Sequence, residues 1–159
     1  MSTPHTGSGH ATPGQRTPEG TRSGRLHVGI VTPEGTVFDG EAHSVVVPGH
    51  EGEVAFYPLH APFVGALGYG ELRLSTGGEL KRWYLEGGVA EVADNQVSVL
   101  AERVLLVEKI DAGEAQAELE KAVASVPADE PAATMRAALI RSAQARLRLA
   151  AQRPPSAAY

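Results

Sequence analysis

Apolar and polar side chains alternate in short stretches between Arg25 and Val107, and this period-two pattern constrains the fold more than any other feature. Alternate residues of a strand lie on one face, so each stretch predicts a half-buried strand. Turn-forming pairs separate the stretches at intervals of roughly eight to twelve residues. The sequence therefore predicts an all-β domain over residues 25–107, a β-sandwich of about ten short strands. The alternating positions are Leu26, Val28, Ile30, Val45, Val47, Leu72, Leu74, Val97, Val99 and Ala101, and the turn pairs are Pro48-Gly49, Gly77-Gly78 and Asp94-Asn95.

Two adjacent glycines interrupt one of these stretches, the segment YLEGGVAEV. Glycine inside a strand weakens it unless the backbone needs a conformation or a closeness that a side chain forbids. Gly87 and Gly88 therefore predict either a β-bulge or a close approach of two backbones.

The period lengthens to that of a helix after the last strand. Asp111 followed three residues later by Glu114 is a capping-box pattern, and apolar residues then recur at helical spacing as far as Pro127. A second helical pattern follows a short link and ends before Pro154. Because the link is short, residues 108–153 are predicted to form an antiparallel αα-hairpin.

The two ends of the chain lack core-forming residues. Sixteen of the first 24 residues are Gly, Pro, Ser or Thr, so we expect residues 1–24 to form a disordered extension. Residues 154–159 are expected to form a disordered tail.

Charge and hydropathy exclude several kinds of partner. The net charge is −5, yet no acid follows Glu130 and five arginines do. The acidic remainder of the chain argues against a nucleic-acid partner. No apolar run is long enough to span a bilayer, and the absence of cysteine excludes disulfides and thiolate chemistry.

One segment, GHEGEVAFYPLHAP, gathers the chain's main cluster of histidines and carboxylates. A small β-sandwich or cupin-like metalloenzyme that uses His43, His50, Glu53 and His60 is an alternative interpretation. The spacing of these residues matches neither a helical nor a strand-spaced ligand pair, so we expect a solvated loop without metal or cofactor. No nucleophile elbow, phosphate-binding glycine loop or dinucleotide fingerprint is found in the sequence.

The order of these segments resembles the epsilon subunit of F-type ATP synthases. The resemblance runs from Leu26 to Arg153 and includes the two stretches LHVGIVTPEGTVFDGEAHSVVVPGHEGEVAFYPLHAP and WYLEGGVAEVADNQVSVLAE and a hairpin that opens with IDAGEA. Two positions depart from the family pattern, Ala55 and Leu59, where glycine is common. The motif residues are Gly49, Gly52, Glu53, Pro58, His60, Ala61, Pro62, Gly87, Gly88, Glu91 and Val92.

The resemblance implies a non-catalytic subunit of the central stalk that couples proton-driven rotation of the c-ring to ATP synthesis. The sandwich would bind the gamma subunit and rest on the c-ring, with Glu53 and His60 in the loop that faces the ring. Gly49, Gly52 and Pro58, together with Pro62, would set the shape of that loop. The expected location is the cytoplasmic face of the bacterial plasma membrane, at its periphery.

The resemblance also implies a regulatory hairpin. Its basic second helix would meet an acidic loop of the beta subunit and oppose ATP hydrolysis. Arg141 and Arg148 share one line of that helix, and Arg146 and Arg153 share another. The alternative is that these arginines merely solvate an exposed helix.

Some members of the family bind ATP through a motif at the start of the hairpin. Asp111 matches that motif, but Glu114 stands where an arginine is needed, and its charge would repel phosphate. We therefore expect no nucleotide site.

Overall fold

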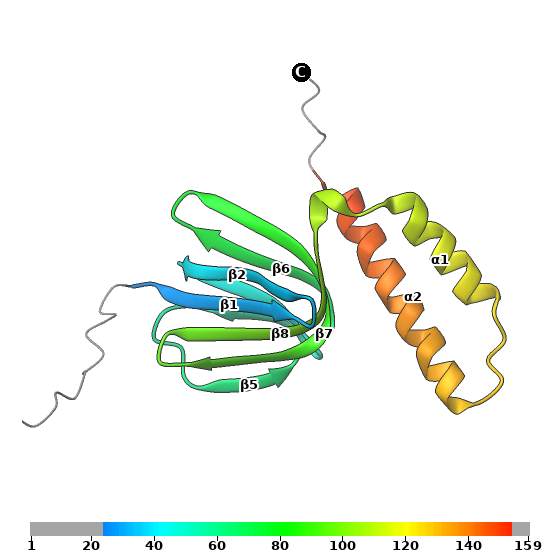
Figure 1. The fold of residues 1–159 in the computed structure, drawn as a ribbon, viewed down its shortest axis with the longest axis horizontal. Helices are drawn as coiled ribbons and strands as arrows, with labels where there is room; N and C mark the ends of the chain where they lie inside the picture. Colours follow the sequence, from blue (N-terminus) through cyan, green and yellow to red (C-terminus); the bar gives the residue numbers. More distant parts are fainter. Residues whose placement is uncertain (1–23, 154–159) are drawn as a thin grey trace, which may run out of the picture.

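The computed structural model describes residues 24–153, so the predictions for the two termini lie, apart from Gly24, outside the described residues. The chain forms strands first and two helices last, which confirms the predicted fold class (Figure 1). The strands are β1 (Leu26–Thr32), β2 (Gly35–Ala42), β3 (Ser44–Gly49), β4 (Gly52–Phe56), β5 (Phe63–Ala66), β6 (Tyr69–Thr76), β7 (Glu79–Ala93) and β8 (Gln96–Leu106), followed by a 3-10 turn, η1 (Val107–Lys109), and the helices α1 (Ala112–Ala124) and α2 (Glu130–Ala151).

Eight strands form where about ten short ones were expected, because β7 runs unbroken for 15 residues and β8 for 11. The strand order is β2-β1-β8-β7-β6-β3-β4, with β5 paired to β7 off this path. β7 pairs along residues 79–86 with β6 and along residues 89–92 with β5. The sheet therefore folds over into two layers, and β7 runs from one layer into the other (Figure 1).

The fold-over takes place at the two glycines of β7. Gly87 has φ +61° and Gly88 has φ +113°, conformations that L side chains rarely adopt. A Cβ on Gly88 would overlap the carbonyl oxygen of Leu100 and lie 2.8 Å from the Cα of Ala101. The pairing of β7 with β8 keeps the same register on both sides of these glycines, so of the two predicted alternatives the close backbone approach is the correct one.

The sandwich core confirms the alternating pattern. Each of the ten alternating positions is buried, and the corresponding side chains of β1, β3, β6 and β8 meet between the layers. Phe56, Trp83 and Leu85 add the large side chains of this core. At full burial each large apolar side chain stabilises the fold by about 1.5–3 kcal/mol, so this cluster carries most of the sandwich's stability.

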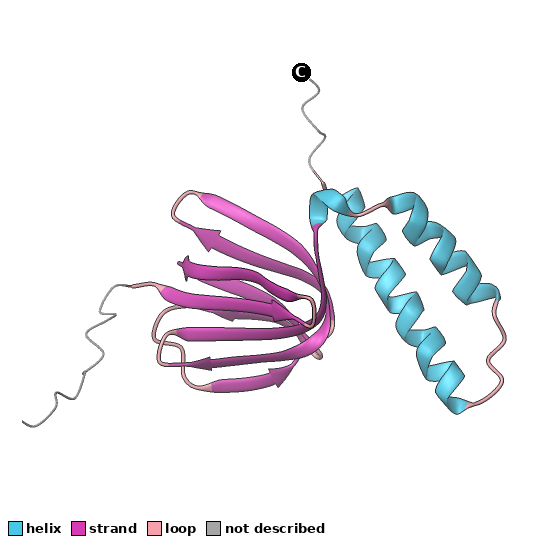
Figure 2. Ribbon diagram, viewed as in Figure 1, coloured by secondary structure: helices cyan, strands magenta, loops and turns pink. Residues whose placement is uncertain are grey.

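The two helices lie together on one side of the strands (Figure 2). Asp111 caps α1 by accepting a hydrogen bond from the backbone N–H of Glu114 at 3.0 Å. Asp129 caps α2 in the same way through the N–H of Ala132 at 2.8 Å, and Pro131 stands in the first turn. Within residues 24–153 no helix has the length and hydropathy to cross a membrane.

Substitution of Gly88 by alanine should destabilise the sandwich by at least about 3 kcal/mol, because the new methyl group meets the backbone of β8 and the positive φ adds strain. Gly29→Ala is the matched control, since an added Cβ there finds no atom within 4 Å and the residue lies in β1, a strand of the same sheet that also pairs with β8. Urea denaturation followed by tryptophan fluorescence measures both. Equal stability of the two variants would contradict the close approach.

Candidate functional site

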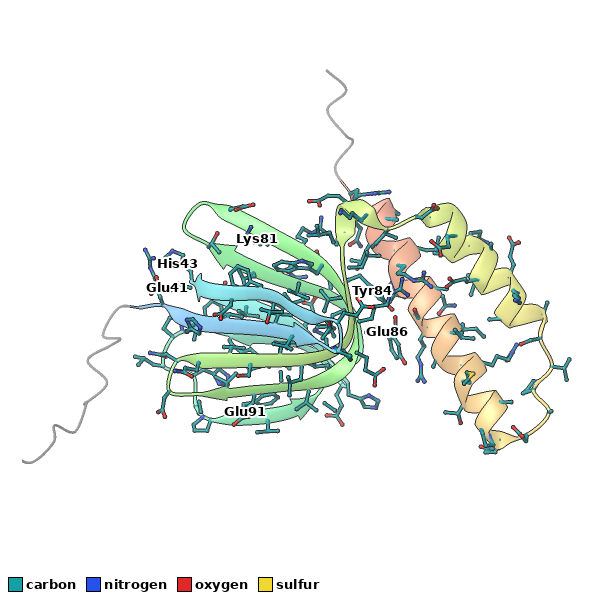
Figure 3. The ribbon with its side chains drawn as sticks, viewed as in Figure 1. Glu41, His43, Lys81, Tyr84, Glu86 and Glu91 are labelled. Carbon is teal, nitrogen blue, oxygen red and sulfur yellow. The ribbon has the colours of Figure 1, made fainter. Side chains whose placement is uncertain are left out.

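Three oxygen atoms join the sandwich to the hairpin. The hydroxyl of Tyr84, on β7, lies 2.9 Å from Oγ of Ser142 on α2 and 3.0 Å from Oε2 of Glu86. Ser142 in turn donates to the same carboxylate oxygen at 3.2 Å. Figure 3 shows Tyr84 and Glu86 at the edge of the sandwich that faces α2. We call these three residues the Tyr84 cluster; the carboxylate accepts and both hydroxyls are satisfied.

Burial keeps the phenol of Tyr84 neutral. The side chain has no exposed surface, and this desolvation raises its pKa well above the usual range, with the nearby Glu86 carboxylate adding to the rise. The hydrogen bond with Ser142 acts in the opposite direction but is weaker than the burial effect. Tyr84 therefore keeps its proton near neutral pH and uses it in a hydrogen bond at the contact with the hairpin.

A small apolar cluster surrounds these oxygens. Val107 and Ile110, at the end of the sandwich, pack with Tyr84 against Ala145 and Leu149 of α2. None of these residues belongs to the core between the sandwich layers. The contact between hairpin and sandwich, which we call the hairpin seat, therefore has its own core and contains few large side chains.

The predicted arginines have different surroundings. Arg141 lies over the ring of Tyr69 at 5.7 Å, and Arg153 donates to the carbonyl oxygen of Glu108 at 2.7 Å. Arg146 is only 3% exposed and pairs with Glu118 of α1. Arg148 lines an open cavity of about 460 Å³ between α2 and the sandwich, together with Arg141, His50, Gln144 and Glu102.

The histidines and glutamate of the loop segment have separate partners. Glu53 forms a two-pronged ion pair with Arg73 at 2.9 Å, and these hydrogen bonds lower the pKa of Glu53 and raise that of Arg73. The His60 ring packs edge-on against Phe56, with 5.2 Å between ring centroids, and its Nδ1 lies 2.7 Å from the carbonyl oxygen of Ala61.

These positions give no support to the metalloenzyme alternative. Figure 3 places His43 at the end of the sandwich away from the hairpin, whereas His50 lines the cavity beside α2. Over residues 24–153, no three side chains of His, Asp or Glu come together closely enough to hold a metal ion.

The turns of this segment require their glycines. A Cβ on Gly49 would lie 2.5 Å from the carbonyl oxygen of Gly52, and Gly52 itself has φ +142°. Leu59, between Pro58 and His60, has φ +66°, and its N–H donates to Oδ1 of Asn95 at 2.6 Å. The left-handed conformation explains why glycine would suit position 59 and why Leu59 is a local departure that leaves the loop intact.

An apolar row crosses the outer face of the sheet. Ala66 pairs with Val89, Val89 with Leu100, and Leu100 with Val31, so their side chains lie side by side across four strands. All four are exposed, and Leu100 is 59% exposed. Because single exposed apolar residues are common but contiguous ones are less so, this row is a candidate interaction surface.

Sequence reasoning missed the hairpin seat, although a signal for it exists. Trp83, Tyr84 and Leu85 are three consecutive large side chains, and all three are buried. A half-buried strand alternates, so an unbroken apolar run indicates a strand that is covered on both faces. The run therefore marks the place where something packs on the outside of β7.

Three comparisons with known proteins bear on this site. Residues 25–107 match the family model for the β-sandwich domain of the ATP synthase delta/epsilon chain. An ATP synthase epsilon chain from Leptospira borgpetersenii is 44% identical over 100 residues, which cover 61% of this chain and 79% of that protein.

Two solved structures share the fold. A chain of the Euglena gracilis mitochondrial ATP synthase, from a structure of OSCP, F1 and c-ring, matches with a TM-score of 0.72 at 20% identity and covers 91% of each chain. A chain from the central stalk and c-ring of the Tetrahymena thermophila mitochondrial ATP synthase matches with a TM-score of 0.57 at 17% identity, over 83% of this chain and 98% of that chain.

Tyr84→Phe should weaken the hairpin seat by about 1 kcal/mol at neutral pH, since it removes the phenolic hydroxyl from the Tyr84 cluster. The pKa of Tyr84 is raised by folding, so its contribution is complete below the ordinary tyrosine pKa of about 10 and is lost as pH rises above it. The stability difference between wild type and variant should therefore shrink above about pH 10.

Hydrogen exchange of the α2 amides and urea denaturation at several pH values measure this difference. Tyr57→Phe is the control, because Tyr57 is exposed and distant in sequence from the seat. A gap that persists unchanged into strong alkali would refute the neutral, buried state of Tyr84.

Proposed function

The chain belongs to the ATP synthase delta/epsilon family, and from this membership we propose that it is the non-catalytic epsilon subunit of an F-type ATP synthase. In that role it would couple rotation of the c-ring to ATP synthesis through the gamma subunit, and its hairpin would restrain ATP hydrolysis. The names of its relatives and the shared fold support the proposal.

The observation that carries the proposal is the separation of the two apolar clusters. The core between the sandwich layers contains no residue of α1 or α2, and the hairpin seat is small and partly polar. Leaving the seat would therefore expose little apolar surface and would not open the sandwich core. This arrangement suits a subunit in which one part stays fixed to a rotor while the other moves.

The sandwich offers two surfaces for fixed partners. We assign the apolar row of Ala66, Val89, Leu100 and Val31 to the gamma subunit, because a lasting contact needs an apolar centre. We assign the loop with Glu53 and His60 to the c-ring, where a charged and aromatic surface would meet the polar ends of the ring's helices.

The hairpin offers a basic surface for a reversible partner. Arginine side chains of α2 would pair with an acidic loop of the beta subunit when the hairpin extends. Because every contact with the membrane would pass through these partners, the chain would lie at the periphery of the cytoplasmic face of the bacterial plasma membrane.

Leu100→Glu should reduce binding of the gamma subunit by about tenfold or more, because a carboxylate buried in an apolar contact without a partner costs more than about 1.4 kcal/mol. Leu80→Glu is the matched control, since Leu80 is 57% exposed on β7 and lies outside the row. Pull-down of purified gamma by the tagged variants measures the effect. Equal retention of gamma would remove the row from the interface.

Deletion of the residues after Pro127 should leave assembly into the ATP synthase intact and raise ATP hydrolysis by roughly fivefold or more, a common size for coupling between sites. Assembly should survive because the sandwich core lies entirely outside the deleted segment. Hydrolysis by the purified complex with either form measures the change. Unchanged hydrolysis would show that the hairpin does not restrain this enzyme.

A further inference from the structure

The carboxylate of Glu91, on β7, borders the apolar row on the outer face of the sheet. Glu91 follows Val89, a member of the row, by two residues, so the two side chains lie on the same face of the strand. The side chain of Glu91 is exposed, and Figure 3 shows it on the sandwich, away from α2. A partner that covers the row therefore also meets Glu91.

The strands beside Glu91 supply no positive charge. Glu91 pairs with Val64 of β5 on one side and with Ser98 of β8 on the other, and Ser98 pairs in turn with Gly29 of β1. Val64 is 71% exposed, and Ser98 is exposed as well. Cross-strand neighbours at this spacing contact each other, so the carboxylate lies among apolar and uncharged groups.

Two other acids of this face have basic partners within the chain. Asp39 of β2 lies 2.7 Å from Nε2 of His27, and Glu41 lies 3.1 Å from Nη1 of Arg25. In the part of the chain that the structure describes, Glu91 forms no ion pair. Its charge is thus left to solvent or to a partner.

Glu102 lies at the opposite border of the row and has different surroundings. It follows Leu100 by two residues on β8 and lines the cavity beside α2 together with Arg141 and Arg148. The docked hairpin therefore brings positive charge towards Glu102. The residues that line this cavity do not include Glu91.

Covering an unpaired carboxylate with an apolar surface is unfavourable, because the charge loses its hydration without compensation. A partner that lays an apolar surface on the row therefore needs a Lys or Arg side chain opposite Glu91. Apolar contact alone leaves the register of the two surfaces weakly defined, whereas one ion pair at the border fixes it.

We propose that Glu91 is the specificity-determining residue of this surface and that it binds a cationic side chain of the gamma subunit. The inference rests on the proposed function, which assigns the row to gamma. The gamma surface that fits has an apolar centre and, at its border, one Lys or Arg that meets Glu91 beside Val64. The row provides contact area, and Glu91 selects the partner and its orientation.

Glu91→Gln in the full-length chain removes the charge and keeps the shape of the side chain. It should weaken binding of purified gamma about tenfold, because the cation of gamma then lies at the contact without its counterion. Glu79→Gln is the matched control: it removes the same charge from an exposed position at the other end of β7, where Glu79 pairs with Lys81. The control should bind gamma as the wild type does.

Biolayer interferometry at several salt concentrations measures these affinities. Salt screens an ion pair at the border of an interface, so the difference between the wild type and Glu91→Gln should shrink as salt rises. Circular dichroism checks that each variant retains its strands.

A charge exchange separates an ion pair from a structural role. Glu91→Lys should weaken binding of gamma by at least about a hundredfold, because two cations then face each other. Among gamma variants with one Lys or Arg replaced by Glu, one should recover much of the binding to Glu91→Lys and bind the wild type poorly.

Three results would overturn the ion pair. Glu91→Gln could bind gamma as tightly as the wild type or more tightly, its loss of binding could be independent of salt, or no gamma variant could recover binding to Glu91→Lys. Failure of the wild-type chain itself to bind gamma would overturn the proposed function, and the role of Glu91 with it. Wild-type binding therefore distinguishes the two failures.

Discussion

The close backbone approach between Gly88 of β7 and Leu100 of β8, which leaves no room for a side chain, is the constraint on which the other features depend. Because no side chain intervenes, β7 can turn from one layer to the other without breaking its register with β8. The first half of β7 then carries Trp83 and Leu85 into the core and Tyr84 to the opposite face. The hairpin seat is thus a product of the same turn that forms the sandwich.

This geometry also explains why the hairpin seat buries little apolar area and yet fixes the hairpin in one docked position. Only a few apolar side chains meet there, so the area removed from water is small. The Tyr84 cluster adds direction, because three oxygens must meet within about a hydrogen-bond length and each is costly to leave unpaired. A contact with little area and exact polar partners favours one docked position without making detachment prohibitive.

The sequence predicted the fold well because its signals are local. Alternation placed the core residues of β1, β3, β6 and β8, and Asp111 correctly marked the start of α1. The number of strands was overestimated because the local pattern does not show how far each strand continues, and β7 and β8 are long. Whether Gly87 and Gly88 mark a bulge or a close backbone approach depends on the neighbouring strand, which the local pattern does not contain.

The site was harder to predict because its contacts join distant segments. The partner of Arg146 depends on how α1 and α2 align, and the partner of Glu53 is Arg73, two strands away in sequence. His50 and Glu53 border one shallow cavity, but Glu53 is paired with Arg73, and within residues 24–153 no group of three potential metal ligands is found. Which partner each side chain takes is decided by strands that lie elsewhere in the sequence.

The charge pattern of the last 29 residues gains a different meaning from these contacts. As a sequence, five arginines without an acid suggest one uniform cationic surface. In the fold, Arg136 and Arg153 are half-buried and bind backbone carbonyls, Arg146 is buried against Glu118, and Arg141 and Arg148 are exposed. Only the charge of Arg146 is balanced by an acid within the hairpin, so the exposed pair Arg141 and Arg148 would dominate the attraction of an acidic partner.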